Sequence, residues 1–194
     1  MKIVLATTSK LKNNILDTVM IKHAQVASEF DEKQFEDANV YEHVKKLSLG
    51  KAQSVLNKVK NSIVIGLDTV GYVNGKILEK PKSVQEAREH VAQSSNNMTR
   101  VVTGLTIINQ LNGEIVNTFV ETKVSFRKIS DREIDFYIKH EPNFMYASGF
   151  ILETVLSNFI DKIEGSYYNI LGVPVETIYK YISAWGYTLD DFED

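Results

Sequence analysis

The segment from Ile63 to Pro81 constrains the fold more than any other part of the sequence. It begins with an apolar strand pattern, reaches an acid at Asp68, and turns at Asn74-Gly75, the dipeptide that most strongly indicates a two-residue hairpin. The return segment leads to Lys80. This pattern predicts a ribbon whose carboxylate and lysine face each other across a cleft, an arrangement suited to a metal-bound polyphosphate. An edge hairpin with surface charges is the alternative that this segment alone leaves open.

Elsewhere, hydrophobic periodicity predicts alternating strands and helices followed by a second, longer ribbon. We expect strands at residues 2–6, 25–27, 101–109, 115–127 and 159–163, and helices at 10–20, 41–59, 83–93, from 130 onward, and 174–185. Capping boxes mark the helix starts at Ser83 and Ser130. Residues 28–39 and 141–154 read as irregular. No internal repeat or low-complexity linker interrupts the chain, so residues 1–194 are expected to form a single α/β domain with a mixed sheet, a long central antiparallel ribbon and flanking helices.

Composition excludes several classes of function. The net charge of −3 gives no reason to expect nucleic acid or an anionic membrane as a partner, and no apolar run is long enough to span a bilayer. The absence of cysteine excludes disulfides, thiol catalysis and cysteine zinc sites. The four histidines lack metal-ligand spacing, which leaves a hard cation held by carboxylates. The N-terminal segment reads as a buried strand rather than a secretory signal, and we expect a cytoplasmic protein.

Three further places carry groups suited to anion or metal chemistry. Ser9 begins a helix directly after a strand, with Lys12 in its first turn, and the N–H groups of a helix start can bind an anion; ordinary N-capping by Ser9 explains the same pattern. Asp31 and Glu32 are paired carboxylates that can hold Mg²⁺ or Mn²⁺, or simply belong to a solvated loop. Lys51 lies within a predicted helix, where a single lysine usually faces solvent.

The loop from Gly165 to Pro174 contains two glycines and an asparagine before the last helix. This composition indicates tight turning with free backbone donors. Such a loop can contact a base or sugar, or can set the approach of the helix.

Taken in this order, these segments resemble the Maf family of nucleotide pyrophosphatases, whose fold is similar to that of the inosine triphosphate pyrophosphatases. The resemblance covers nearly the whole chain. It rests on seven short segments: Ala6-Thr7-Thr8-Ser9, Phe30-Asp31-Glu32, Lys51-Ala52, Gly66-Leu67-Asp68-Thr69-Val70, Lys80-Pro81, Val102-Thr103-Gly104 and the loop from Gly165 to Pro174.

The resemblance implies two lobes around a cleft and hydrolysis of a nucleoside triphosphate between its α and β phosphates. It makes Asp68 the general base beside a divalent cation, Mg²⁺ or Mn²⁺, with Glu32 as the second metal carboxylate. The remaining residues that it implies for substrate binding are Ser9, Lys12, Lys51, Lys80, Thr69 and Glu153. Exposed strand edges also make a homodimer plausible.

Departures from the family pattern leave the substrate and the turnover open. Leu11 and Lys12 stand where the family usually has two arginines, and a lysine lacks the bidentate grip of an arginine. Glu79 replaces a glycine beside Lys80, and Thr99 replaces a histidine. A nucleotide-binding regulatory protein without efficient catalysis is therefore the alternative. The inosine triphosphate pyrophosphatase family itself is disfavoured, because no Asp-Asp-Ser-Gly segment is present.

The signals for the base conflict. Thr69 resembles the branch that acts on dTTP and UTP, whereas Phe150 and Glu153 resemble the branch that prefers 7-methyl-GTP. A carboxylate accepts two hydrogen bonds from a guanine edge, while a pyrimidine favours an amide partner.

Overall fold

We analysed the protein in a computed structural model, which describes residues 1–32, 39–144 and 150–192. The first three strands of its sheet are β1 (Lys2–Ala6), β2 (Ala24–Val26) and β3 (Ser62–Val73). The others are β4 (Lys76–Leu78), β5 (Met98–Asn109), β6 (Ile115–Phe126) and β7 (Ile160–Glu164). The strand order is β2-β1-β3-β5-β6-β7, with β4 paired to β3.

The sheet is mixed, as predicted. Strand β1 pairs in parallel with both β2 and β3, whereas β4 runs antiparallel to β3 and β7 runs antiparallel to β6. The long ribbon is formed by β5 and β6, joined by the short turn 110–114, and the start of β3 lies beside the end of β5, where the Gln110 N–H donates to the Ser62 carbonyl. The α/β class and the central antiparallel ribbon are therefore confirmed.

The chain divides into two compact units. Unit 1 comprises Met1–Thr69, Val102–Val120 and Ser166–Asp194, and unit 2 comprises Val70–Val101 and Glu121–Gly165. Strands β3, β5 and β6 contribute residues to both units. That residues 1–194 act as one domain stays a prediction.

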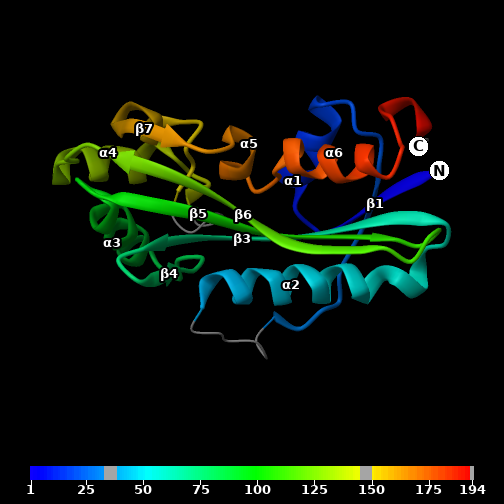
Figure 1. Ribbon diagram of the computed structural model, residues 1–194. Coiled ribbons are helices and arrows are strands. Elements are labelled where there is room, and N and C mark those ends of the chain that lie inside the picture. The colour runs from blue at the N-terminus through cyan, green and yellow to red at the C-terminus, as the bar shows by residue number, and fades with distance from the viewer. Residues whose placement is uncertain (33–38, 145–149, 193–194) are drawn as a thin grey trace. The chain divides into compact units, whose positions relative to one another are not determined.

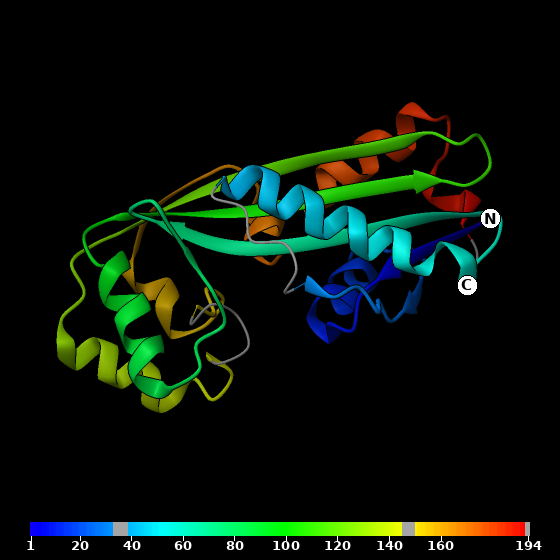
Figure 2. The same cartoon turned by 90° about the horizontal axis from the view of Figure 1, so that it is seen from below.

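In unit 1, helices cover both faces of the sheet (Figure 1). Helices α1 (Lys10–Thr18) and α6 (Val175–Ala184) lie on one face and α2 (Val40–Val55) lies along the other, as the view from below in Figure 2 also shows. Strand β3 is buried on both faces, which explains its continuous apolar run. The side chains alternate: Ile63, Ile65 and Leu67 join the core with α1 and α6, whereas Val64 packs on the α2 side.

Two glycines allow α2 to lie very close to the sheet. A Cβ atom at Gly66 would overlap the carbonyl oxygen of Ser48, and one at Gly104 would overlap the carbonyl oxygen of Val44. Both carbonyls belong to α2. The Ser48 hydroxyl also forms a buried hydrogen bond of 3.0 Å with the hydroxyl of Thr106. The distance between α2 and the sheet is thus set by small residues on β3 and β5.

Unit 2 contains helices α3 (Val84–Ser94) and α4 (Asp131–His140), linked by an ion pair of 2.8 Å between Arg88 and Asp135. The predicted capping box of α4 is present, because the Glu133 carboxylate accepts the Ser130 N–H at 2.8 Å. At the start of α3, Ser83 caps the helix as predicted, but the Glu86 carboxylate accepts the N–H of Lys82 rather than that of Ser83.

The short helix α5 (Tyr167–Ile170) and the 3-10 helices η2 (Leu56–Lys58), η4 (Val155–Phe159) and η5 (Leu189–Asp191) were not predicted. They are single turns, too short to show a hydrophobic period. Of the predicted irregular segments, residues 33–38 and 145–149 lie outside the described residues. Among the helices that the structure describes, none has the length and apolar character needed to cross a membrane.

The Glu133 carboxylate makes the stability of unit 2 depend on pH. Hydrogen bonds from Arg127 and then from Ser130 lower the pKa of Glu133 to about 2 from its ordinary value of 4.5. A carboxylate with a lowered pKa stabilises the fold above its ordinary pKa, and this stabilisation is lost as the pH falls from 4.5 towards 2. We expect Glu133→Gln to melt at a lower temperature than the wild type at pH 7, with the difference closing in that acidic range. Thermal unfolding monitored by circular dichroism measures this, and Glu79→Gln, at an exposed carboxylate, serves as the control. A difference that persists at pH 2 would contradict the explanation.

Candidate active site

An ion pair between β3 and α2 forms the centre of the candidate site. The strand alternation that sends Leu67 to one core sends Asp68 to the α2 side. There the Lys51 ammonium donates to Asp68 Oδ1 over 2.6 Å. Both side chains are largely buried, with 14% of the Lys51 side chain and 9% of the Asp68 side chain exposed. Lys51 therefore does not face solvent, because the close approach of α2 turns its side chain onto β3.

A second carboxylate reaches the same lysine. Glu32 Oε1 lies 3.1 Å from the Lys51 Nζ, but 53% of the Glu32 side chain is exposed. The sequence prediction that Glu32 and Asp68 act together is consistent with this arrangement, since one ammonium bridges them. Asp31 is exposed.

The segment before Glu32 is held along α2 by alternate residues. The Ser28 hydroxyl bonds to the Ser54 hydroxyl over 2.9 Å, and the ring of Phe30 lies where a Cβ atom of Gly50 would be. Glu32 is the next residue in this alternation, and it meets Lys51. A glycine at position 50 is thus required for Phe30 to pack here, and sequence reasoning gave no role to either residue.

The electrostatics of the cluster favour a charged lysine. Burial disfavours the Lys51 ammonium, but the carboxylates of Asp68 and then Glu32 outweigh it and raise the pKa of Lys51 above its ordinary value. The second oxygen of Asp68, Oδ2, is buried and accepts no hydrogen bond from the described residues. A buried carboxylate oxygen without a partner is costly. It is the atom here that is best placed to take a further ligand or proton.

The helix that follows β1 brings a second lysine to the strand that carries Asp68. Ala6, the last residue of β1, pairs with Gly66 on β3, and in parallel sheets ligands commonly bind at the carboxyl ends of strands. The Lys12 ammonium donates to the carbonyl of Leu67 over 3.3 Å. Ser9 is the N-cap of α1, and its hydroxyl accepts the Lys12 N–H at 3.4 Å. Ser9 therefore acts as an ordinary N-cap, the alternative to anion binding that the sequence left open. Its contact with a triphosphate stays a prediction.

Thr69 is held in place by two neighbours that the sequence analysis left without a role. Its hydroxyl lies 3.1 Å from the hydroxyl of Thr103, which is fully buried. Gly172 adopts a left-handed backbone with φ of 81°, and a Cβ atom there would come within 2.9 Å of Thr69 Oγ1 and 3.1 Å of Lys12 Cε. The loop from Gly165 to Pro174 therefore ends against Thr69 and Lys12. The segment Val102-Thr103-Gly104, which is part of the family resemblance, is the sequence signal that could have identified Thr103.

The other two predicted substrate residues belong to unit 2. Lys80 follows β4 and is exposed, and Glu153 is exposed in the turn before η4. Their part in the site of Asp68 stays a prediction. Thr99 has a structural position: it is buried, and its hydroxyl lies 2.7 Å from that of Ser94, where β5 meets the end of α3. The segment from Ala147 to Glu153 is a further departure from the family pattern, and its residues 147–149 lie outside the described residues.

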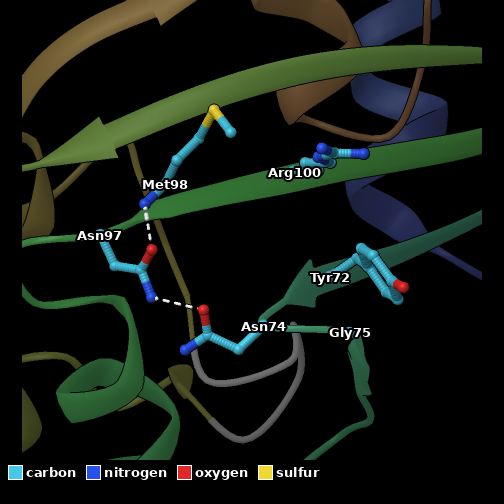
Figure 3. A pocket seen from close by; sticks show the side chains of 6 residues that line it. All are labelled: Tyr72, Asn74, Gly75, Asn97, Met98 and Arg100. Atoms are coloured by element: carbon cyan, nitrogen blue, oxygen red, sulfur yellow. Dashed lines mark hydrogen bonds between the residues drawn. The ribbon is translucent and has the colours of Figure 1, made fainter.

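Unit 2 also has a hollow of about 350 Å³ between β3 and β5, lined by Tyr72, Asn74, Gly75, Asn97, Met98 and Arg100 (Figure 3). Its amides are already used: Asn97 donates to Asn74 over 2.9 Å and accepts the backbone N–H of Met98. Arg100 lies 3.7 Å from Glu121. None of the predicted site residues lines this hollow.

The two carboxylates near Lys51 are too few to hold a hard cation by themselves, so further oxygen ligands must come from a substrate or water. No group of three or more carboxylates or histidines is placed to hold a metal ion among residues 1–32, 39–144 and 150–192. Asp68 and Glu32 supply two carboxylates, and the bare Oδ2 atom of Asp68 supplies one unused oxygen. Mg²⁺ is commonly held by one or two carboxylates together with substrate phosphates and water. The donor set therefore suits a metal that arrives with a phosphorylated substrate.

The fold of the chain is found in a solved structure. The chain is similar to the solved structure of the Staphylococcus aureus Ham1 protein, with a TM-score of 0.53 over 95% of this chain and 100% of the other, at 12% sequence identity. At that identity the likeness shows the fold alone. The family follows from the sequence: residues 2–185 match the Maf-like protein family, and the chain belongs to it.

Curated relatives align over nearly their full length. A protein of Clostridium perfringens strain SM101 named dTTP/UTP pyrophosphatase is 34% identical over 97% of this chain and 100% of its own length. A protein of Clostridium kluyveri strain ATCC 8527 with the same name is 35% identical, with the same shares covered. The resemblance found in the sequence is thus confirmed.

Proposed function

We propose that this Maf-family protein is a nucleoside triphosphate pyrophosphatase that breaks the α–β phosphoanhydride and releases a nucleoside monophosphate and pyrophosphate. The observation that carries the proposal is the buried Asp68–Lys51 pair, bridged to Glu32, on β3 just beyond the carboxyl end of the parallel strand β1. The names of the clostridial relatives support the same reaction.

In this proposal the residues of unit 1 position charge around the phosphates. Asp68 accepts the proton of the attacking water through a carboxylate oxygen, and Lys51 and Lys12 neutralise the phosphate charge. Phosphoryl transfer depends mostly on such positioning and neutralisation. A divalent cation, Mg²⁺ or Mn²⁺, held by Asp68 and Glu32, would stabilise charge on the phosphate oxygens. Lys80 and Glu153 are the remaining residues that we propose contact the substrate.

For the base, we propose dTTP and UTP as the substrates. Both clostridial relatives carry these substrates in their names, and Thr69, held by Thr103, matches the same branch. The two residues that instead resemble the 7-methyl-GTP branch, Phe150 and Glu153, lie in or beside the turn that precedes η4 in unit 2. The proposal also includes a cytoplasmic location and no nucleic acid partner. A homodimer is supported by β2 and β7, which are the terminal strands of the sheet order.

Pyrophosphate release from a nucleotide panel tests the proposal. The panel contains dTTP, UTP, CTP, ITP, GTP and 7-methyl-GTP, each with Mg²⁺ and then with Mn²⁺. We expect release from dTTP and UTP at rates well above those for the purines. Preference for 7-methyl-GTP would overturn the choice of base but not the reaction. Triphosphate binding without release from any nucleotide would favour the regulatory alternative, for which Leu11, Glu79 and Thr99 are the motivation.

A further inference from the structure

The Lys51 ammonium contacts both of the carboxylates to which the proposed function assigns a metal ion. The distance from Lys51 Nζ is 2.6 Å to Asp68 and 3.1 Å to Glu32. An ammonium is a compact positive charge with three N–H donors, so one lysine can pair with both carboxylates. An ammonium and a divalent cation beside the same two carboxylates repel each other. The Lys51 ammonium therefore neutralises part of the negative charge of these two carboxylates.

We infer that Lys51 acts as an internal counterion that keeps metal off Asp68 and Glu32 until a nucleotide arrives to accept the lysine. This inference rests on the proposed function. It assigns the lysine two successive partners: the carboxylates in the free protein, and a phosphate group in the complex. Metal and nucleotide then bind together rather than separately.

The two carboxylates differ in how easily they can change partner. The Asp68 side chain is 9% exposed, whereas 53% of the Glu32 side chain is exposed to water. Exposed ion pairs are weak, because water screens them and side-chain entropy opposes them. Glu32 can therefore exchange the lysine for another cation at small cost, and buried Asp68 has its unused Oδ2 atom to offer to that cation. A phosphate near Lys51 supplies the negative charge that offsets the second cation.

Mn²⁺ binding in the absence of nucleotide tests the inference, measured by titration calorimetry or by the loss of the free-ion electron paramagnetic resonance signal. We expect Lys51→Met to bind Mn²⁺ alone about tenfold or more tightly than the wild type, because one positive charge beside the ion is removed. The same variant should bind a non-hydrolysable dTTP analogue with Mn²⁺ more weakly than the wild type. Equal or weaker binding of Mn²⁺ alone by a folded Lys51→Met protein would overturn the inference.

Two further variants separate charge from other effects. Lys51→Arg keeps the positive charge and should show no gain in Mn²⁺ affinity. Lys45→Met removes a lysine from the same helix, where Lys45 pairs with Glu42, and should also show none. A tenfold gain in either control would mean that helix charge or packing, rather than the counterion, sets the affinity.

The wild type supplies a measurement that does not depend on whether Lys51→Met folds. A ligand that binds only the native state raises its melting temperature, so Mn²⁺ alone should leave the wild-type melting temperature nearly unchanged, whereas Mn²⁺ with the dTTP analogue should raise it. A rise of the same size with Mn²⁺ alone would overturn the inference. None of these readouts requires turnover. If the protein releases pyrophosphate but fails these binding tests, the counterion role is wrong and the proposed function is retained. If it passes the binding tests but releases no pyrophosphate, the proposed reaction is wrong and the counterion role of Lys51 is retained.

Discussion

Replacing Asp68 by asparagine is expected to reduce pyrophosphate release by about 100- to 10,000-fold, the range typical of losing a general base. Asparagine has nearly the same shape, but it cannot accept a proton from water at neutral pH. The substitution also leaves the Lys51 ammonium without its closest partner, which lies 2.6 Å away in the wild type. Initial rates with dTTP and Mg²⁺ measure the effect, and binding of the non-hydrolysable analogue is measured in parallel.

The matched control for this prediction is Asp190→Asn, at an exposed carboxylate near the C-terminus, which should retain the wild-type rate. Melting temperatures of both variants show whether the fold is retained. We expect Asp68→Asn to bind the analogue within about tenfold of the wild type, a change of about 1.4 kcal/mol. A wild-type rate in this variant would show that Asp68 is not the general base. An equal loss of binding and rate would make it a binding residue instead.

The sequence analysis names Asp68, Lys51 and Glu32 as candidates, but it does not show which side chains contact one another. The hairpin pattern places Asp68 opposite Lys80, and the family resemblance assigns Lys51 to the substrate, but neither indicates that Lys51 pairs with Asp68. The structure pairs Asp68 with Lys51 because the alternation of β3 and the short distance to α2 bring them together. That distance depends on contacts between segments far apart in the chain, which local periodicity does not contain.

The same reason explains the residues to which sequence reasoning gave no role. Phe30 and Gly50 matter only because one packs on the other, and Thr103 matters because its hydroxyl meets that of Thr69. Helix starts, by contrast, were predicted well. The capping side chains of Ser83 and Ser130 bond to backbone or side-chain groups within three residues, so the signal for these helices is local.

The dependence of the site on helix packing leads to a second large effect, at Gly66. A Cβ atom there would overlap the Ser48 carbonyl oxygen and lie 2.9 Å from the Ala52 nitrogen. Both atoms are backbone atoms of α2, so a side-chain rotation cannot relieve the clash, and the helix itself must move. We expect Gly66→Ala to lower the free energy of unfolding by about 1–3 kcal/mol, the usual cost of overpacking a core.

The same movement should lower activity, because Ala52 adjoins Lys51, and a displaced helix carries the ammonium away from Asp68. Urea denaturation measures the stability, and pyrophosphate release measured well below the urea transition reports the activity of the folded fraction. Gly75→Asn is the control: the turn at Gly75 has a φ of 80° and open space around it, and asparagine tolerates this conformation. We expect the control to stay within about 0.5 kcal/mol of the wild type. A Gly66→Ala protein with wild-type stability and rate would show that α2 can withdraw from β3 without disturbing the Lys51–Asp68 pair, and the glycines would then have no part in building the site.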